Sequence, residues 1–148
     1  MKKKHIKSFY PKQGSLPEQW VLYDANNKVL GRAASDISSI VLGKKSATYT
    51  PGVFNQQYVV VINAEKIKVT GKKLTEKKYY RHSGYPGGLK ETTYEALMSK
   101  KPTEALRKAV NGMLPHNSHG RMLQTKVFYY ADDNHQQQAQ QPVAFVEG

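Results

Sequence analysis

The chain has 148 residues, enough for one compact domain with a hydrophobic core of its own. It contains no cysteine, which excludes disulfide scaffolds, cysteine-ligated zinc sites and thiol nucleophiles. Its 23 Lys and Arg against 11 Asp and Glu give a formal net charge of +12, which predicts a polyanionic partner such as a nucleic acid but does not separate RNA from DNA.

Residues 1–19 predict a basic N-terminal arm that precedes the domain. Lysines surround Phe9 and Tyr10 there, no acidic residue comes before Glu18, and two prolines and a glycine interrupt regular structure. Aromatic rings placed between cations can stack on unpaired bases. The same composition is also typical of a solvated, disordered end, so RNA contact and disorder are the two interpretations of this arm.

The domain is expected to begin with a strand and a helix. Residues 20–23 form a short strand-like run that ends at Asp24, before a turn rich in Asn. Apolar residues then recur at helical spacing from Leu30 to Val41. Gly43 follows as a natural residue for the end of a helix, so the pattern predicts a helix that ends before it.

Residues 58–62 form a continuous apolar run, Tyr-Val-Val-Val-Ile. A strand with one solvated face would alternate apolar and polar residues, so this run predicts a strand of a parallel sheet that is covered on both faces. Cover on both faces implies a domain of three layers. Ile67 and Val69 extend the apolar pattern into a short element, and residues 77–81 predict a further, exposed strand.

Two helices are expected in the next part of the chain. Thr92 and Glu95 have the spacing of a capping box, which predicts that a helix begins after Thr92. Pro102 suits the first turn of a second helix, whose apolar face continues to Val110 and which is expected to end at Gly112.

A short helical piece over residues 120–125 and a strand over residues 127–130 complete the expected domain. Strands and helices thus recur in alternation, which predicts an α/β domain over residues 20–131. From residue 132 the chain is rich in Gln and has little that could form a core. Residues 132–148 are therefore interpreted as a Gln-rich C-terminal tail.

Enzyme sites have weak support in this sequence. The segments Gly43-Lys44-Lys45 and Gly71-Lys72-Lys73 lack the earlier glycine and the following Ser or Thr of a nucleotide-binding phosphate loop, and no dinucleotide fingerprint follows the first strand. A nucleoside triphosphatase or dinucleotide enzyme is therefore not expected.

Three further alternatives remain weak for lack of supporting residues. Ser83, His82 and Asp24 supply the residue types of a hydrolase triad, but Ser83 is not in the Gly-x-Ser-x-Gly turn that exposes such a nucleophile. His116 and His119 could act with Lys126 as acid and base for RNA cleavage. They could also bind a metal, but no further acidic or His ligands stand close by in the sequence. Hydrogen bonding to phosphate or backbone is the favoured role for these histidines.

Export and membrane insertion are not expected either. The longest apolar run is too short to cross a bilayer, and no signal-peptide-like apolar stretch follows the Lys-rich beginning of the chain. Because the absence of cysteine suits a reducing compartment, we expect a cytoplasmic protein.

Residues 66–90 form the strongest candidate for a binding segment. Lysines and Arg81 are opposed there only by Glu76, and tyrosines able to stack on bases stand between them. The adjacent Gly87 and Gly88 would let backbone lie close to a phosphate. The alternative is a solvated, glycine-rich loop between strands.

A series of short motifs runs through most of the chain. In chain order they are Trp20 with Asp24-Ala25, Leu30-Gly31-Arg32, Gly43-Lys44, Tyr49-Thr50-Pro51, Asn63-Ala64-Glu65-Lys66, Thr70-Gly71-Lys72-Lys73, Tyr79-Tyr80-Arg81-His82-Ser83-Gly84, Pro86-Gly87-Gly88, Gly112-Met113-Leu114-Pro115, Gly120-Arg121, His135 and Gln141-Pro142. Together they resemble the large-subunit ribosomal protein thirteen family of the bacterial type. Each segment alone is unspecific, but their shared order over most of the chain is specific.

The resemblance implies a three-layer α/β/α domain with a mostly parallel four-stranded sheet. It further implies ribosomal RNA of the large subunit as main ligand, neighbouring large-subunit proteins as partners, an early role in subunit assembly, and no enzyme activity, cofactor or small-molecule substrate. A free RNA-processing enzyme and a nucleic-acid chaperone outside the ribosome are the competing functions.

The resemblance also suggests which residues contact RNA. Carried over by position, they are Lys44, Lys72, Lys73, Arg81, His82, Gly87, Gly88 and Arg121. Local chemistry alone adds Lys45, Tyr85 and Lys90. The chain departs from the family pattern at His116, where Lys is usual, at Gln137, where a second His is common, and in the Lys-rich arm.

Overall fold

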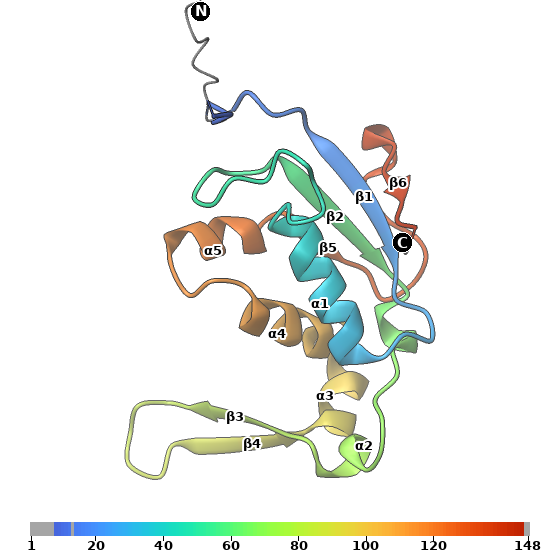
Figure 1. Cartoon of the computed structure of the whole chain (residues 1–148). Helices are drawn as coiled ribbons and strands as arrows, with labels where there is room; N and C mark the ends of the chain where they lie inside the picture. Colours follow the sequence, from blue (N-terminus) through green and yellow to red (C-terminus); the bar gives the residue numbers. More distant parts are fainter. Residues whose placement is uncertain (1–7, 13, 147–148) are drawn as a thin grey trace, which may run out of the picture.

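A four-stranded parallel sheet forms the centre of the computed structural model, which describes residues 8–12 and 14–146 (Figure 1). The strands lie in the order β5-β2-β1-β6. Their bounds are Val127–Tyr129 for β5, Gln57–Ile62 for β2, Gln19–Asp24 for β1 and Val143–Ala144 for β6. All three pairings are parallel, which confirms the α/β class and the four-stranded parallel sheet.

Helix α1, Leu30–Val41, connects β1 to β2 and has the bounds that its apolar spacing predicted. Gly43 follows it with a φ of +77°, a conformation that favours glycine. A Cβ at Gly43 would also collide with the side chain of Asn55, whose Nδ2 donates to the carbonyl oxygen of Leu42 at 3.0 Å. The end of α1 is thus fastened to the loop that leads into β2.

The remaining helices follow β2 in the chain. They are the short 3-10 helix η1 (Ala64–Lys66), then α2 (Lys73–Glu76), α3 (Tyr94–Lys100), α4 (Glu104–Met113), α5 (Ser118–Gln124) and the 3-10 helix η2 (Gln138–Gln140). Helix α4 packs against α1, and Figure 1 shows both in front of the same face of the sheet.

Two expected helix limits differ from the structure. The Oγ1 of Thr93, not of Thr92, caps α3 by accepting from the backbone N–H of Ala96 at 3.3 Å, because Thr92 is paired with Tyr79 in a strand. Helix α4 does not end at Gly112 but runs through it to Met113. The burial of Leu114, which is 2% exposed and donates its N–H to Val110, holds that last turn in place.

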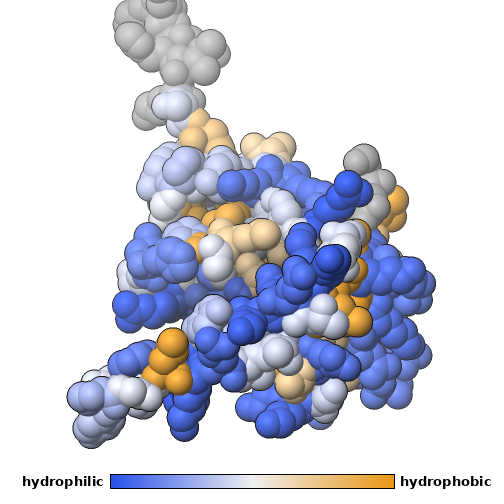
Figure 2. All heavy atoms as spheres, turned by 90° about the horizontal axis from the view of Figure 1, so that it is seen from below, coloured by the Kyte–Doolittle hydropathy of each residue, from blue (hydrophilic) through white to orange (hydrophobic). Residues whose placement is uncertain are grey.

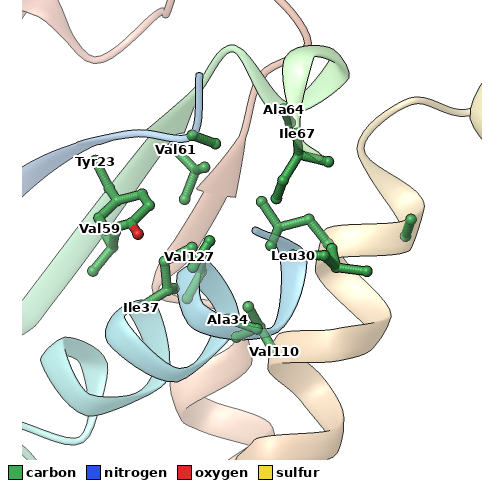
Figure 3. Close-up of a cluster of buried hydrophobic side chains, with 14 of the residues drawn as sticks. Tyr23, Leu30, Ala34, Ile37, Val59, Val61, Ala64, Ile67, Val110 and Val127 are labelled. Carbon is green, nitrogen blue, oxygen red and sulfur yellow. The ribbon is translucent and has the colours of Figure 1, made fainter. Parts of the chain in front are cut away.

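The core lies between this face of the sheet and the helices. In Figure 3, Val59 and Val61 of β2 point toward Ala34 and Ile37 of α1, with Val110 of α4 beneath them. All five side chains are fully buried. The burial of Val59, Val60 and Val61 agrees with the apolar run that predicted β2.

Aromatic side chains lie on the opposite face. The ring of Trp20 stacks on Tyr58 at 4.5 Å and on Phe128 at 5.7 Å between ring centroids. These three rings are only partly exposed, and Val60 between them in β2 is fully buried. Trp20 is the single tryptophan of the chain, so its fluorescence reports directly on this sheet.

The fourth strand comes from the segment that the sequence analysis interpreted as a tail. Strand β6 is parallel to the other strands, so residues 130–142, which connect β5 to β6, have to run back along the sheet. This connection crosses the sheet in the direction opposite to that from β1 to β2, so a right-handed crossover places it on the face opposite α1. The second outer layer is thus this return segment with η2, rather than a long α-helix. Phe145, just after β6, packs on Tyr23 with ring centroids 5.6 Å apart.

A second, two-stranded sheet projects from the helical side of the domain. Strand β3, Lys78–His82, pairs antiparallel with β4, Leu89–Thr93. Figure 1 shows this hairpin extending beyond α3 and α4, away from the main sheet. The exposed strand that residues 77–81 predicted is therefore confirmed.

Stability at high pH is expected to depend on Tyr129. Burial raises the pKa of its hydroxyl well above the ordinary value of 10, and among the described residues that hydroxyl has no hydrogen-bond partner. The folded protein therefore keeps a proton that the unfolded chain releases above pH 10, so the free energy of unfolding falls as pH rises beyond 10.

Tyr129→Phe should remove this loss, since phenylalanine does not ionise. At pH 8 we expect the variant to be as stable as the parent or up to about 1 kcal/mol more stable, because no hydrogen bond is lost. At pH 11 its advantage should grow by about 1 kcal/mol. Urea unfolding followed by Trp20 fluorescence at both pH values measures this, and a variant that is clearly less stable at pH 8 would contradict it.

Candidate nucleic-acid interface

The hairpin presents two different faces because side chains alternate along its strands. Arg81 lies directly opposite Lys90 in the register, and Tyr79 shares their face. His82 lies opposite Leu89, on the other face. Arg81 and His82, which the sequence analysis placed in one site, therefore point in opposite directions.

Arg81 and Lys90 form a like-charge pair on exposed strands. Like charges directly opposite each other destabilise an antiparallel pair, so this arrangement favours a polyanion that neutralises both. On the other face, by contrast, the Nζ of Lys78 lies 2.9 Å from a carboxylate oxygen of Glu91, whose hydrogen bond raises the pKa of that lysine.

Tyr79 anchors the basic face of the hairpin to the body. Its ring packs against the core, and burial raises the pKa of its hydroxyl. The ammonium groups of Lys77 and Lys108 lie 5.5 Å and 5.0 Å from the ring centroid. A strand residue held in this way orients Arg81, two positions further on, on the same face.

The backbone of the hairpin turn requires glycine at two positions, Gly87 and Gly88. Gly87 has a φ of +70°, which side chains rarely adopt, although the space around it is open. A Cβ at Gly88 would come within 2.8 Å of the carbonyl oxygen of Tyr85. The turn itself therefore needs both glycines, whatever the hairpin binds.

The exposed surface of the hairpin is mostly hydrophilic, with one hydrophobic patch near its end in Figure 2. Tyr85 in the turn is 76% exposed, and Tyr80 and Leu89 are also exposed. None of these residues contributes to the core. The hairpin thus carries rings and cations that are available for contact.

The other candidate residues fall into two groups. Lys72 and Lys73 stand at the start of α2, which packs against α3 and β4 at the base of the hairpin. Lys44 and Lys45 follow α1, and Arg121 is exposed on α5. In Figure 1 the end of α1 and α5 lie far from the hairpin, so the candidates do not form one cluster.

Comparison with known proteins decides the family. A model of the family described as Ribosomal protein L13 matches residues 18–136. The chain belongs to this family. It is 51% identical over 138 residues to the large ribosomal subunit protein uL13 of Lawsonia intracellularis (strain PHE/MN1-00), a match that covers 93% of this chain and 96% of that protein.

Other relatives with the same name agree. The large ribosomal subunit protein uL13 of Thermobifida fusca (strain YX) is 47% identical over 95% of this chain and 94% of its own length. That of Acholeplasma laidlawii (strain PG-8A) is 49% identical over 93% and 96%. Membership of the ribosomal protein L13 family confirms the resemblance, and it makes the chain a structural ribosomal protein rather than an enzyme.

In this L13 family member, a basic pocket that the sequence analysis missed lies beside α1. It has a volume of about 430 Å³, and its walls include Tyr23, Lys28, Arg32, Asp36 and Lys45. Lys45 also lies 4.2 Å from the ring centroid of Phe145. Arg32 belongs to the family-like segment Leu30-Gly31-Arg32, which was the one available signal for this pocket.

The enzyme-like alternatives find no support in the geometry of the L13 chain. Asp24 accepts from the N–H of Asn26 and the Nδ2 of Asn63 at the end of β1, while the Nδ1 of His82 accepts from the N–H of Gly84 in the hairpin turn. Lys126 donates to the carbonyl oxygen of Asn55. Each of these groups already has a structural role.

The described residues contain neither a metal-binding cluster nor a membrane-spanning helix. Over residues 8–12 and 14–146, no three His, Asp or Glu side chains are placed to hold a metal ion. Among the helices of that same part of the chain, none has the length and apolar content needed to cross a membrane.

Proposed function

We propose that this L13 family member binds and stabilises folded ribosomal RNA of the large subunit, early in subunit assembly, in the cytoplasm and beside other large-subunit proteins. The exposed pair of Arg81 and Lys90, opposed on a projecting hairpin, is the observation that carries the proposal. Among the described residues no carboxylate forms a salt bridge with either cation, and two such adjacent cations are suited to two phosphates of one RNA strand.

The remaining candidates extend this contact over several parts of the surface. Lys72 and Lys73 continue it at the base of the hairpin. Lys44 after α1 and Arg121 on α5 add exposed cations away from the hairpin, and Lys45 lies at the pocket beside α1. Along the hairpin, the further residues proposed to contact RNA are His82, Tyr85, Gly87, Gly88 and Lys90. A protein that binds RNA at separate sites can hold distant RNA segments together, as expected of a structural protein in subunit assembly.

Sedimentation tests the proposal against its two competitors. After a high-salt wash, the tagged protein should remain with large subunits in a sucrose gradient, because many simultaneous contacts hold it there. A free processing enzyme or an RNA chaperone would instead stay at the top of the gradient. Pulse labelling of precursor particles should find the protein already in the earliest ones, and its absence from them would contradict the early role.

Arg81→Ala should weaken RNA binding without unfolding the domain. The substitution removes a forked donor to phosphate, which costs about 1 to 3 kcal/mol, or on the order of 10- to 100-fold in affinity. The melting temperature should stay the same or rise slightly, since repulsion from Lys90 disappears. Filter binding to a large-subunit RNA fragment and thermal unfolding are measured on the same sample.

Lys78→Ala is the matched control on the other face of the hairpin. Its charge is already paired with Glu91, so its loss should reduce affinity much less than the loss of Arg81. Equal losses for the two variants would show that total charge matters and that the face with Arg81 does not. If Arg81→Ala unfolds the protein, the arginine is structural.

A further inference from the structure

A pocket of about 420 Å³ lies between the loop before β2 and the start of α5, away from the hairpin. Its walls include Tyr49, Pro51, Phe54, Pro115, Asn117 and His119. Pockets of this size hold small planar ligands, and a nucleobase with its sugar fits within the volume. None of the lining residues is acidic.

The aromatic side of this pocket is held firmly. The ring of Phe54 stacks on His119 with centroids 4.4 Å apart and planes 23° apart. The start of α5 cannot shift easily, because the side-chain oxygen of Asn117 accepts from the N–H of Gly120 at 2.9 Å and Gly120 packs tightly on Pro115. Preorganised rings are suited to stack on a flat ligand with little loss of entropy.

Polar groups in the pocket remain available for a ligand. Within residues 8–12 and 14–146, the Tyr49 hydroxyl, the Nδ2 of Asn117 and the Ser118 hydroxyl make no hydrogen bond to the protein. Tyr49 is 39% exposed, so its ring is accessible from solvent. Amide and hydroxyl groups of this kind match the donors and acceptors on the edge of a base.

Cations occur in the chain segments next to the pocket. Lys44 stands two positions after Leu42, which lines the pocket, and Arg121 is exposed on α5, whose first residues also line it. Lys12 lines an adjoining cavity of about 290 Å³ that shares Gly52 and Phe54 with it. An RNA strand that placed a base in the pocket would have cations near its phosphates on either side.

We propose that this pocket binds one unpaired base of RNA, stacked on the exposed ring of Tyr49, with the flanking phosphates on Lys12, Lys44 and Arg121. The inference rests on the proposed function and goes beyond it, because it assigns a base-binding site apart from the basic hairpin. Among the possible occupants, an apolar side chain of a neighbouring protein would leave the free polar groups and the surrounding cations unused.

The test compares two single strands of equal charge, an eight-residue poly(A) RNA and its counterpart without bases, binding to the full-length protein. Anisotropy of labelled strands at low salt should show the poly(A) strand bound about tenfold more tightly, because stacking of one base contributes on that order. Tyr49→Ala should abolish most of this preference and leave binding of the baseless strand unchanged. Tyr49→Phe, which keeps the ring, should retain the preference.

Met122→Ala, an exposed position of α5 that does not line the pocket, is the control and should keep the preference. Unchanged thermal unfolding, followed by Trp20 fluorescence, should show that the Tyr49 variants are folded. Equal affinity of the parent protein for both strands, or a full preference in Tyr49→Ala, would overturn the base pocket. In that case the proposed function still stands if both strands bind.

Two further outcomes separate the proposals from each other. If neither strand binds even at low salt, the RNA-binding function itself fails and the base pocket fails with it. If Tyr49→Ala reduces incorporation into large subunits although no base preference exists, the pocket holds a protein side chain and the base assignment is wrong.

Discussion

Gly120→Ala is expected to destabilise the domain by about 2 to 4 kcal/mol. An added Cβ would overlap the main-chain carbonyl of Pro115, and neither group can move away easily. Pro115 has a restricted backbone, and Gly120 is fixed by the cap that Asn117 forms at the start of α5. The melting temperature should fall by on the order of 10 °C.

Gly112→Ala is the matched control for this prediction. Gly112 lies within α4, and a Cβ there would meet no other atom within 4 Å. Because alanine is the better helix former, this variant should be about 0.5 to 1 kcal/mol more stable than the parent. A Gly120→Ala protein that melts with the parent would show that α5 can move away from Pro115, which would also weaken the argument for a preorganised base pocket.

RNA binding is expected to weaken on the order of a thousandfold when monovalent salt rises from about 50 to 200 mM, provided that about six lysines and arginines neutralise phosphates. The reason is the release of condensed counterions from the RNA, whose entropic gain shrinks as bulk salt increases. The candidate cations on the hairpin, on α2, after α1 and on α5 are exposed and therefore able to contribute.

Titrations of a large-subunit RNA fragment at four salt concentrations give the slope of log affinity against log salt. Arg81→Ala should make this slope shallower by about one contact, whereas Gly112→Ala should leave it unchanged. Binding that does not respond to salt would contradict an interface built on phosphate contacts.

Two elements of the main domain have apolar patterns that predict them from the sequence alone. The sequence predicts the helix over Leu30–Val41 because its apolar residues recur at helical spacing. It predicts the strand over Gln57–Ile62 because an unbroken apolar run is typical of a strand that is covered on both faces. The basic strand over residues 78–82 was predictable for a similar reason, since polar residues flank its tyrosines.

Other features could not be predicted from local pattern. Strand β6 contains only Val143 and Ala144 and follows a Gln-rich segment, so the local sequence does not indicate a strand. It forms because it pairs with β1, which is far away in the sequence. The cap at Thr93 depended likewise on the strand pairing of Thr92 with Tyr79. In both cases a long-range contact outweighed the local signal.

The α/β class, the excess of positive charge and the ribosomal protein L13 family follow from the amino-acid sequence, because composition, periodicity and the order of short segments are properties of the linear chain. Which residues act together depends on the folded structure. Alternation along β3 turns Arg81 toward Lys90 and His82 away from it. Folding brings Tyr49 and His119 into the wall of one pocket although some seventy positions separate them in the chain. A surface is made by residues that are close in space, and that proximity is fixed by packing of the core rather than by local sequence.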